Sequence, residues 1–299
     1  MTELRSGLSA APLSAADAGS VTEVWRACEE HDDGVAQCVE ADVVAFLGRP
    51  SFDFARDSVG IRDGDALVAF GVQLGVRITF VHVLPPYRGR EIGAWLLRWS
   101  QDAARALGAE LTAQEISDNE HAAIALLERD GYVRRWDFWA MDIALEEEPT
   151  APALPSGYAI RDFVPGRDER VAFDVIHRAF SEWPEHVPST FEDWSATSLG
   201  RPGFAPPLLA LLEGEGEVVG VVLLIEDEDE GWIDQLAVAR EHRGRGLARA
   251  LLVHAFGMTW RRGRRRCGLG TDARTGARGL YEHVGMRVRR TYGEYAKPL

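Results

Sequence analysis

A glycine-rich turn before a helix carries the strongest chemical signal in the sequence. Residues 243–248 read Arg-Gly-Arg-Gly-Leu-Ala, follow an apolar run at 233–238 and precede a predicted helix at 249–260. Such a turn directs unpaired backbone N–H groups and the positive end of the helix dipole at one place. Arg243 and Arg245 add guanidinium groups, each of which can bind a phosphate through two N–H donors. The segment therefore predicts a pyrophosphate site.

A second segment with a chemical signal follows the first in the sequence. Residues 267–271 predict a short strand, and residues 275–283 predict a helix that ends in Leu-Tyr-Glu-His shortly before Gly285. Taken together, the turn and this helix resemble motifs A and B of the GNAT acetyltransferases, with R-x-x-G-x-A in the turn and L-Y-x-x-x-G in the helix. A dinucleotide-binding fold is the rival for the turn alone, but the turn does not have the spacing G-x-G-x-x-G.

The resemblance implies a donor substrate and its contacts. In that family the turn binds the pyrophosphate of acetyl-coenzyme A (acetyl-CoA), and a tyrosine lies beside the sulfur. Tyr281 holds that place and would protonate the departing thiolate, or donate a hydrogen bond to it, because a phenol with an ordinary pKa near 10 is protonated at neutral pH. The alternative is a core tyrosine. The implied cofactor-binding residues are Leu236, Ala237, Val238, Arg243, Gly244, Arg245, Gly246, Leu247 and Ala248.

A base and an acceptor site complete the prediction. An amine must lose a proton to attack a thioester, so a carboxylate or a water relay is needed near the strand before the turn. Asp234 is the first candidate and Glu226 the second, although each could equally be a carboxylate that faces solvent. If the acidic run 226–230 borders the acceptor, it favours a cationic amine. The predicted substrate-binding residues are Trp183, Glu185, His186 and Trp232.

The elements that must position these residues occur twice. The chain has 299 residues, enough for two domains of about 150 residues each. Glutamates followed by prolines predict a linker at 149–155, between a first domain at 1–148 and a second at 156–299. In each half a strand, an amphipathic helix and a β-hairpin precede the turn, and the two turns lie 155 positions apart. We predict an α/β protein of two tandem GNAT-like domains, each a mixed, mainly antiparallel sheet flanked by helices.

The first repeat departs from the second at two chemical positions. Glu91 stands where the second repeat has Gly246, so a carboxylate would meet the pyrophosphate. Leu127 stands where the second repeat has Tyr281, so the proton donor is missing. We expect a degenerate first domain and a competent second one. The whole layout resembles tandem GNAT proteins of the actinobacterial mycothiol synthase type.

Composition excludes several other classes. The net charge is −14, so non-specific nucleic-acid binding through the arginine-rich run 261–266 is disfavoured. No apolar run is long enough to span a membrane, the start of the chain lacks a secretory signal, and the three cysteines have no metal-binding spacing. We expect a cytoplasmic monomer or homodimer without a metal. The predicted function is N-acetyl transfer from acetyl-CoA to a primary amine of a small molecule, and the alternative is a non-catalytic acyl-CoA sensor or scaffold.

Overall fold

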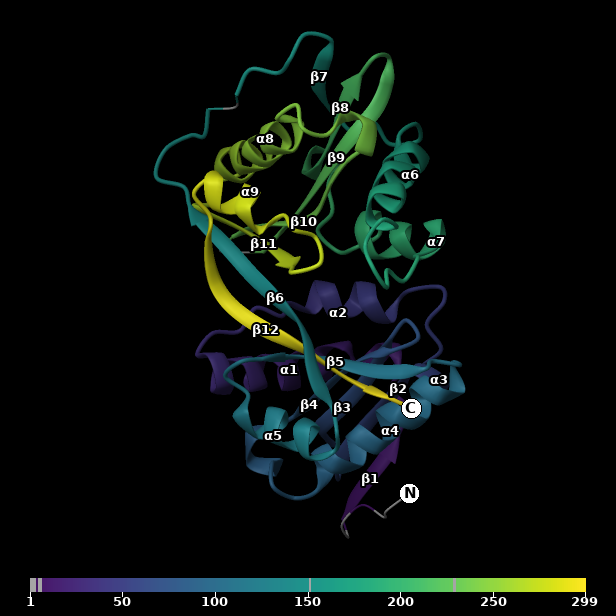
Figure 1. Cartoon of the computed structure of the whole chain (residues 1–299). Helices are drawn as coiled ribbons and strands as arrows, with labels where there is room; N and C mark the ends of the chain where they lie inside the picture. The colour runs from purple at the N-terminus through teal and green to yellow at the C-terminus, as the bar shows by residue number, and fades with distance from the viewer. Residues whose placement is uncertain (1–3, 5–6, 151, 228–229) are drawn as a thin grey trace. The chain divides into compact units, whose positions relative to one another are not determined.

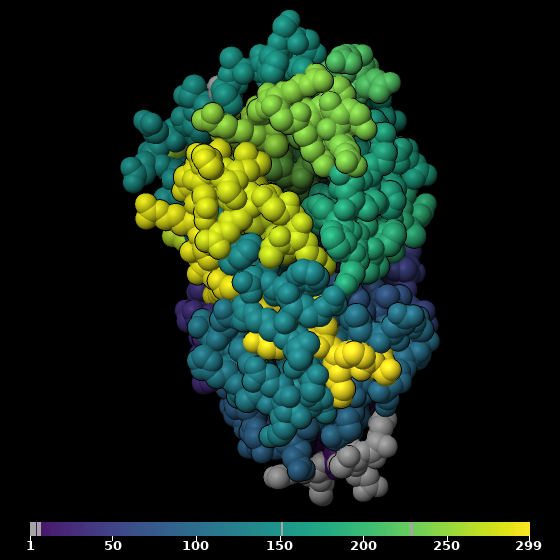
Figure 2. All heavy atoms as spheres, in the orientation of Figure 1, coloured from purple at the N-terminus to yellow at the C-terminus, as the bar shows by residue number. Residues whose placement is uncertain are grey.

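Two compact units make up the chain in a computed structural model, which describes residues 4, 7–150, 152–227 and 230–299. Unit 1 comprises Met1–Asp137 and Thr291–Leu299, and unit 2 comprises Phe138–Arg290. Strand β6 (Val133–Ala144) begins in unit 1 and ends in unit 2, whereas β12 (Arg287–Pro298) runs the opposite way. Figure 2 shows the yellow last residues among the blue and teal atoms of unit 1. A single boundary at 149–155 cannot describe this exchange of strands, and residue 151 of the predicted linker lies outside the described residues.

Unit 1 has strands in the order β1-β2-β3-β4-β5-β12. Neighbours are antiparallel except β4 and β5, which are parallel and pair only at Ile78 and Ala113. Its strands are β1 (Leu8–Ala11), β2 (Ser58–Asp63), β3 (Ala66–Leu74), β4 (Ile78–Val83) and β5 (Leu111–Ser117). Its helices are α1 (Ala18–Asp33), α2 (Glu40–Leu47), α3 (Phe54–Asp57), α4 (Ile92–Ala106) and α5 (His121–Arg129), with short 3₁₀ turns at Ala15–Asp17 and Pro85–Tyr87.

Unit 2 repeats this plan with strands in the order β6-β11-β10-β9-β8-β7. Again one neighbouring pair, β10 and β11, is parallel and the rest are antiparallel. Its further strands are β7 (Tyr158–Asp162), β8 (Leu209–Gly214), β9 (Glu217–Glu226), β10 (Gly231–Val238) and β11 (Arg266–Asp272). Its helices are α6 (Glu169–Phe180), α7 (Phe191–Trp194), a π-helical turn (Ser195–Leu199), α8 (Leu247–Arg261) and α9 (Arg278–His283), with 3₁₀ turns at Pro206–Leu208 and Arg240–His242.

Both faces of the unit 2 sheet are buried. Successive residues of β9 point to opposite faces, so Val221 and Leu223 join the core under α6, whereas Val222 and Leu224 join the core under α8. Figure 1 shows α6 and α8 on opposite sides of β8, β9 and β10. The mixed α/β sheet flanked by helices, predicted from the repeats, is confirmed in each unit.

Two predicted helices begin elsewhere than expected. Helix α8 begins at Leu247, two residues before the predicted start, because Gly246 takes a left-handed backbone and caps it. Helix α9 begins at Arg278 rather than Thr275, because the Asp272 carboxylate accepts from the backbone N–H of Arg274 and Thr275 and holds a turn there. In the described ranges, no helix combines the length and apolar character that crossing a membrane requires.

Candidate active site

A cavity opens in unit 2 where the parallel strands β10 and β11 separate. The two strands pair only over Gly231–Ile233 and Cys267–Leu269, and beyond this point the remainder of β10 turns one backbone edge toward the gap. The cavity there measures about 390 Å³. It is lined by Phe138, Ala179, Phe180, Trp183, Ile233, Asp234, Leu236, Ala237, Val238, Arg243, Ala248, Leu269, Gly270, Thr271, Asp272, Thr275, Ala277, Leu280 and Tyr281. Predicted catalytic and cofactor-binding residues from β10, from the glycine-rich turn with the start of α8, and from α9 thus meet in one cavity.

A β-bulge places Asp234 at this cavity. The register of β10 against β9 shifts between Ile233 and Gln235, so Asp234 is the extra residue and its side chain is exposed. The simple alternation that would put Asp234 on one strand face with Trp232 and Leu236 is therefore interrupted. The Gln235 side chain is held by Trp194, whose indole N–H donates to the amide oxygen at 2.9 Å. The bulge aims a carboxylate at the place where strands β10 and β11 diverge.

The glycine-rich turn adopts the backbone that the sequence suggests. Gly244 and Gly246 have φ of 76° and 77°, and Gly246 is the N-cap of α8. A Cβ added at either glycine would meet no atom within 4 Å, so the turn is open on that side. The first backbone N–H groups of α8 have no partner within the helix, and the positive end of the dipole adds to them. This arrangement fits a bound diphosphate.

Arg243 does not present a free guanidinium to this turn. Its Nε donates to the Val238 carbonyl at 2.9 Å, and its two terminal nitrogens bind the Glu182 carboxylate at 2.9 and 3.1 Å. Arg88 makes the equivalent contacts in unit 1, to the Val83 carbonyl at 3.1 Å and to Asp32 at 2.6 Å twice. The arginine of each turn thus ties the turn to its preceding strand and to an acid, and the expected phosphate contact of Arg243 stays a prediction.

Arg245 lies on the outer side of the turn. It donates to the Tyr158 hydroxyl and lies 3.8 Å from a Glu215 carboxylate oxygen. The same tyrosine hydroxyl is 2.9 Å from Nδ1 of His242. Arg245, Gly244, Gly246 and buried Leu247 do not line the cavity itself but form the rim that continues from it.

Tyr281 lies on α9 with its ring in the wall of the cavity. The residue is 9% exposed and packs in the core under α8. Burial raises the pKa of its hydroxyl to about 12, although a hydrogen bond with Thr271 offsets part of the rise. The phenol therefore keeps its proton throughout the neutral range.

The predicted acceptor residues divide into two groups. Trp183 lines the cavity and stacks on Phe180, with ring centroids 4.2 Å apart. Glu185, whose φ is 59°, and His186 lie in the same loop but not in the cavity lining. Burial and the charges of His177 and Arg274 lower the pKa of His186. Trp232 instead covers Gly268 of the neighbouring strand and is also outside the lining.

The acidic run does not reach the cavity with any described residue. Glu226 pairs with Arg262 at 2.5 Å, and Glu230 binds Arg289 at 2.8 and 3.1 Å. Residues 228 and 229 lie outside the described residues. The expectation that Glu226 acts as a second base, or that the run steers a cationic amine, gains no support, because its acids pair with arginines at the far end of β10. The arginine-rich run 261–266 includes arginines that bind Glu148, Glu226 and Asp142.

Sequence reasoning missed part of the cavity wall. Phe138 belongs to β6, which precedes the predicted linker, so the sequence assigned it to the wrong half. A Cβ on Gly270 would lie 2.4 Å from the Phe138 ring, so a larger residue at this position would clash with the ring. Asp272 and Thr275 also line the cavity. In the loop before α9, the Thr275 hydroxyl donates to the Asp272 carbonyl. A glycine in the middle of a strand was the available signal, because it marks close approach of another group.

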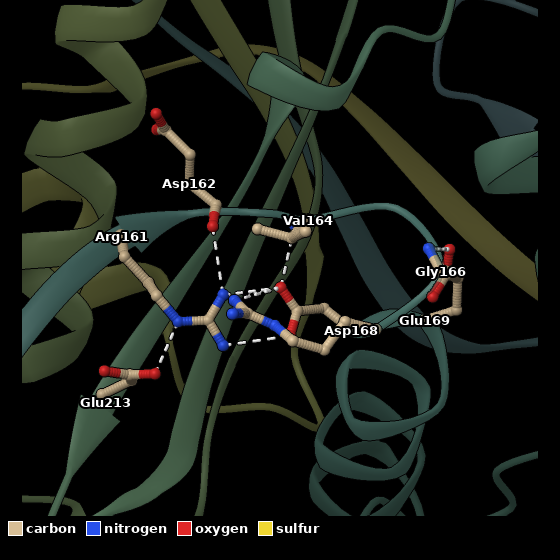
Figure 3. Close-up of polar contacts among 8 residues, drawn as sticks. Arg161, Asp162, Val164, Gly166, Asp168, Glu169 and Glu213 are labelled. Atoms are coloured by element: carbon tan, nitrogen blue, oxygen red, sulfur yellow. Dashed lines mark hydrogen bonds and ion pairs between the residues drawn. The ribbon is translucent and has the colours of Figure 1, made fainter.

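An ion-pair network around buried Asp168 fixes the start of α6, which carries Ala179 and Phe180 to the cavity. Figure 3 shows Asp168 held by Arg161 at 2.6 and 3.0 Å and by the backbone N–H of Val164 at 2.8 Å. Arg161 also binds Glu213 of β8. Burial alone would raise the pKa of Asp168, but these donors, with Arg167, hold it well below its usual range.

Unit 1 has the same framework with different chemistry. Its cavity, of about 760 Å³, lies where β4 and β5 separate. Glu91 has φ of 68° at the N-cap of α4, a left-handed backbone that costs a residue other than glycine about 1–2 kcal/mol. Leu127 is buried where unit 2 has Tyr281, and the β3–β4 register contains no shift, so the bulge of β10 has no counterpart. Among the described residues, no cluster of three His, Cys, Asp or Glu could hold a metal ion.

Each unit has a pair of parallel strands that diverge beside a glycine-rich turn and a helix N-terminus. This arrangement, which occurs twice in the chain, defines a tandem acyltransferase fold. The chain belongs to the Acetyltransferase (GNAT) family, whose model matches residues 20–132 and 170–286. A mycothiol acetyltransferase of Thermobispora bispora is 34% identical over 212 residues, 68% of this chain and 70% of that protein. One of Sanguibacter keddieii is 30% identical over 232 residues, 73% of this chain and 71% of that protein. The chain is thus an acetyl-CoA-dependent acetyltransferase.

Solved structures agree with the tandem architecture. A GCN5-related N-acetyltransferase from Sphaerobacter thermophilus has a TM-score of 0.78 and 31% identity, with 99% of this chain and 97% of that chain covered. A tandem GNAT protein from the clavulanic acid biosynthesis pathway has a TM-score of 0.76, with 97% and 98% covered. At 17% identity the second likeness concerns the fold alone.

Proposed function

We propose that the chain transfers the acetyl group of acetyl-CoA to a primary amine of a small molecule, and that unit 2 carries out the reaction. The observation that carries the proposal is the contrast between the repeats. Unit 2 combines a cavity-lining tyrosine, a bulge that presents Asp234, and a glycine at the N-cap of α8. At the equivalent places unit 1 has Leu127, a strand β4 that pairs with β3 without a bulge, and Glu91.

The residues of unit 2 fit acetyl-CoA. The edge of β10 at Leu236–Val238 would hold the pantetheine arm by backbone hydrogen bonds, because β11 no longer pairs with it there. The N–H groups of the turn and of the first turn of α8 would hold the diphosphate, and Arg245 adds positive charge at the rim. Once bound, acetyl-CoA supplies an activated thioester carbonyl.

Tyr281 and Asp234 supply the proton transfers. The amine nitrogen forms a bond to the acetyl carbon, and the carbon–sulfur bond breaks with its electron pair on sulfur. Tyr281 donates its proton, or a hydrogen bond, to that sulfur, for which a pKa of about 12 keeps it protonated. Asp234 accepts the proton that the amine loses, directly or through water. The products are the amide and coenzyme A.

The cysteines support direct attack over an acetyl-enzyme. All three are buried thiols, and Cys267 is the one within unit 2. Burial raises the pKa of Cys267 to about 12, although Thr259 partly offsets it, and raises that of Cys28 to about 11. A thiol must ionise and be accessible to act as a nucleophile. None of the three meets both conditions.

The test is an acceptor screen with the full chain. The protein is incubated with acetyl-CoA and a panel of primary amines, including the acceptor of the mycothiol acetyltransferases, and free thiol and acetylated product are both measured. Alcohols of matched carbon skeleton serve as controls. We expect thiol release with amines only, and initial-rate lines that intersect, as direct attack requires. Thiol release that depends on the alcohols, or parallel lines, would contradict the proposal.

A further inference from the structure

Thr271 lies near the end of β11, in the wall of the unit 2 cavity that also contains Tyr281. Its side chain is 4% exposed, and its hydroxyl makes a hydrogen bond with the hydroxyl of Tyr281 on α9. This bond joins a buried strand residue to the proton donor of the reaction proposed for unit 2. The Thr271 hydroxyl is therefore placed to direct the phenol of Tyr281.

A second threonine holds the Thr271 hydroxyl from the other side. The Oγ atoms of Thr271 and Thr275 are 3.0 Å apart. Thr275 donates its own hydroxyl proton to the Asp272 carbonyl at 2.9 Å and accepts from the backbone N–H of Ala277 at 3.1 Å. A hydroxyl has one proton and two lone pairs, so Thr275 can only accept from Thr271. Thr271 thus has one fixed neighbour and one reactive neighbour, and its single proton can turn toward either.

Unit 1 has aliphatic side chains in place of both hydroxyls. Strands β5 and β11 have seven residues each, and Ile116 holds the sixth place in β5 as Thr271 does in β11. Leu127 corresponds to Tyr281, because the backbone carbonyl of each accepts from the N–H of the fifth residue after it, at 3.0 and 3.1 Å. Ile116 and Leu127 pack in one hydrophobic cluster and both line the unit 1 cavity. The two hydroxyls are therefore present together in unit 2 and absent together in unit 1.

The fold of the repeat does not need a hydroxyl at this strand position. Burying a hydroxyl costs free energy unless a hydrogen bond compensates it. Ile116, which is 5% exposed, shows that the same place in the sheet accepts an aliphatic side chain. The neighbour that gains from a hydroxyl in unit 2 is Tyr281.

The hydrogen bond favours the ionised form of Tyr281. Burial raises the pKa of Tyr281 to about 12, whereas the bond with Thr271 acts in the opposite direction. Thr271 thus stabilises the phenolate that Tyr281 becomes when it gives its proton to sulfur, and an acid acts more effectively when its conjugate base is stabilised. During that transfer the Thr271 proton turns from Thr275 to the phenolate oxygen. The proton that Asp234 takes from the amine returns through water to Tyr281 and restores the phenol.

We propose that Thr271 is a positioning residue for Tyr281, whose hydroxyl it holds in place before the reaction and to which it donates as the Tyr281 proton leaves for the sulfur of coenzyme A. The inference rests on the function proposed for unit 2 and adds one residue to its machinery. Thr271 acts on the substrates through Tyr281.

Carbon-13 NMR of the full chain, labelled at Cζ of tyrosine, tests the hydrogen bond without any substrate. The chain has six tyrosines, and the signal missing from Tyr281→Phe identifies Tyr281. Thr271→Val, which keeps the shape and removes the hydroxyl, should shift that signal, and Thr271→Ser should leave it near the wild-type position. Thr259→Val is the matched control, because Thr259 is a buried threonine of unit 2 that does not line the cavity. It should leave the Tyr281 signal in place.

Thiol release measures the consequence for the reaction. Thr271→Val should lower kcat roughly tenfold, as loss of a hydrogen bond to a charged group predicts, with the Kd of acetyl-CoA and the KM of the acceptor little changed. Thr271→Ser should keep most of the wild-type kcat, and Thr259→Val should keep all of it. In a Tyr281→Phe background, Thr271→Val should have no further effect, because the hydroxyl on which it acts is gone. Thermal unfolding checks that each variant is folded.

Three results would overturn the inference and leave the proposed function intact. One is a Tyr281 signal that Thr271→Val does not move, and another is a wild-type kcat in that variant. The third is the same tenfold loss with and without the Tyr281 hydroxyl, which would give Thr271 a structural role only. If the wild-type protein releases no thiol with any amine, the proposed function fails and the inference fails with it. The two failures are therefore distinguishable.

Discussion

The substitution Gly246→Glu would place in unit 2 the residue that unit 1 has at the equivalent helix N-cap, Glu91. The backbone of Gly246 has φ of 77°, and an added Cβ would meet no atom within 4 Å. A side chain therefore fits, and the cost is the left-handed backbone, about 1–2 kcal/mol. Glu91, with φ of 68° in the equivalent place, shows that the framework tolerates this residue. We expect the variant to fold with a modest loss of stability.

The effect on acetyl-CoA binding comes from charge. A carboxylate about 4 Å from a phosphate charge, at an effective dielectric constant of about 20, is unfavourable by about 4 kcal/mol. Solvent exposure and salt reduce this at an open turn, and we take about 2 kcal/mol as the remaining penalty. That value corresponds to roughly a 30-fold rise in Kd. Gly246→Gln is the matched control, because it has the same size and backbone strain without the charge.

Calorimetric titration with acetyl-CoA measures the difference between these two variants. Gly246→Gln should weaken binding several-fold at most, and Gly246→Glu should weaken it at least tenfold further. Because the additional loss is electrostatic, it should shrink as ionic strength rises. Equal affinity of the two variants would refute the reasoning and would mean that the diphosphate does not lie at this turn.

Two further substitutions test the site and its scaffold. Asp234→Asn should lower kcat by roughly 10²-fold in the thiol-release assay with little change in acetyl-CoA affinity, as loss of a general base requires, and an unchanged kcat would assign that role to another group. Asp168→Ala should destabilise the fold by about 3 kcal/mol in denaturant unfolding, because buried Asp168 accepts from five donor atoms of Arg161, Val164 and Arg167. Since its pKa is lowered in the fold, the stabilisation from Asp168 is present above the ordinary aspartate pKa and is lost as pH falls below it. A pH dependence in acid that is the same for wild type and Asp168→Ala would argue against this account.

Local features of the fold and site could be predicted from the sequence because they depend on neighbouring residues. The turn at 243–248 needs only glycine at two left-handed positions and a helix after it, and both are found. Tyr281 and Asp234 meet in one cavity because the tandem motifs fix which strands run parallel. The repeat also indicated correctly where unit 1 departs, at Glu91 and Leu127.

Features that depend on distant pairing could not be predicted. No local pattern shows that β6 ends in unit 2 or that β12 ends in unit 1, so Phe138 was assigned to the other half. The bulge at Asp234 arises from the register against β9 and interrupts the alternation that the sequence suggested. The ion pair of Arg243 with Glu182, 61 positions earlier, likewise has no local signal in the sequence.

The most direct test of catalysis in unit 2 is the kcat of Tyr281→Phe at saturating acetyl-CoA and acceptor. Tyr132→Phe is the control, since it removes the hydroxyl of a buried tyrosine that lies in unit 1. We predict that Tyr281→Phe lowers kcat roughly 10²-fold with acetyl-CoA affinity little changed, and that Tyr132→Phe keeps the wild-type rate. The wild-type rate should also hold to about pH 10, because the pKa of Tyr281 is raised to about 12. A wild-type kcat in Tyr281→Phe would contradict the account and would make Tyr281 a residue of the core.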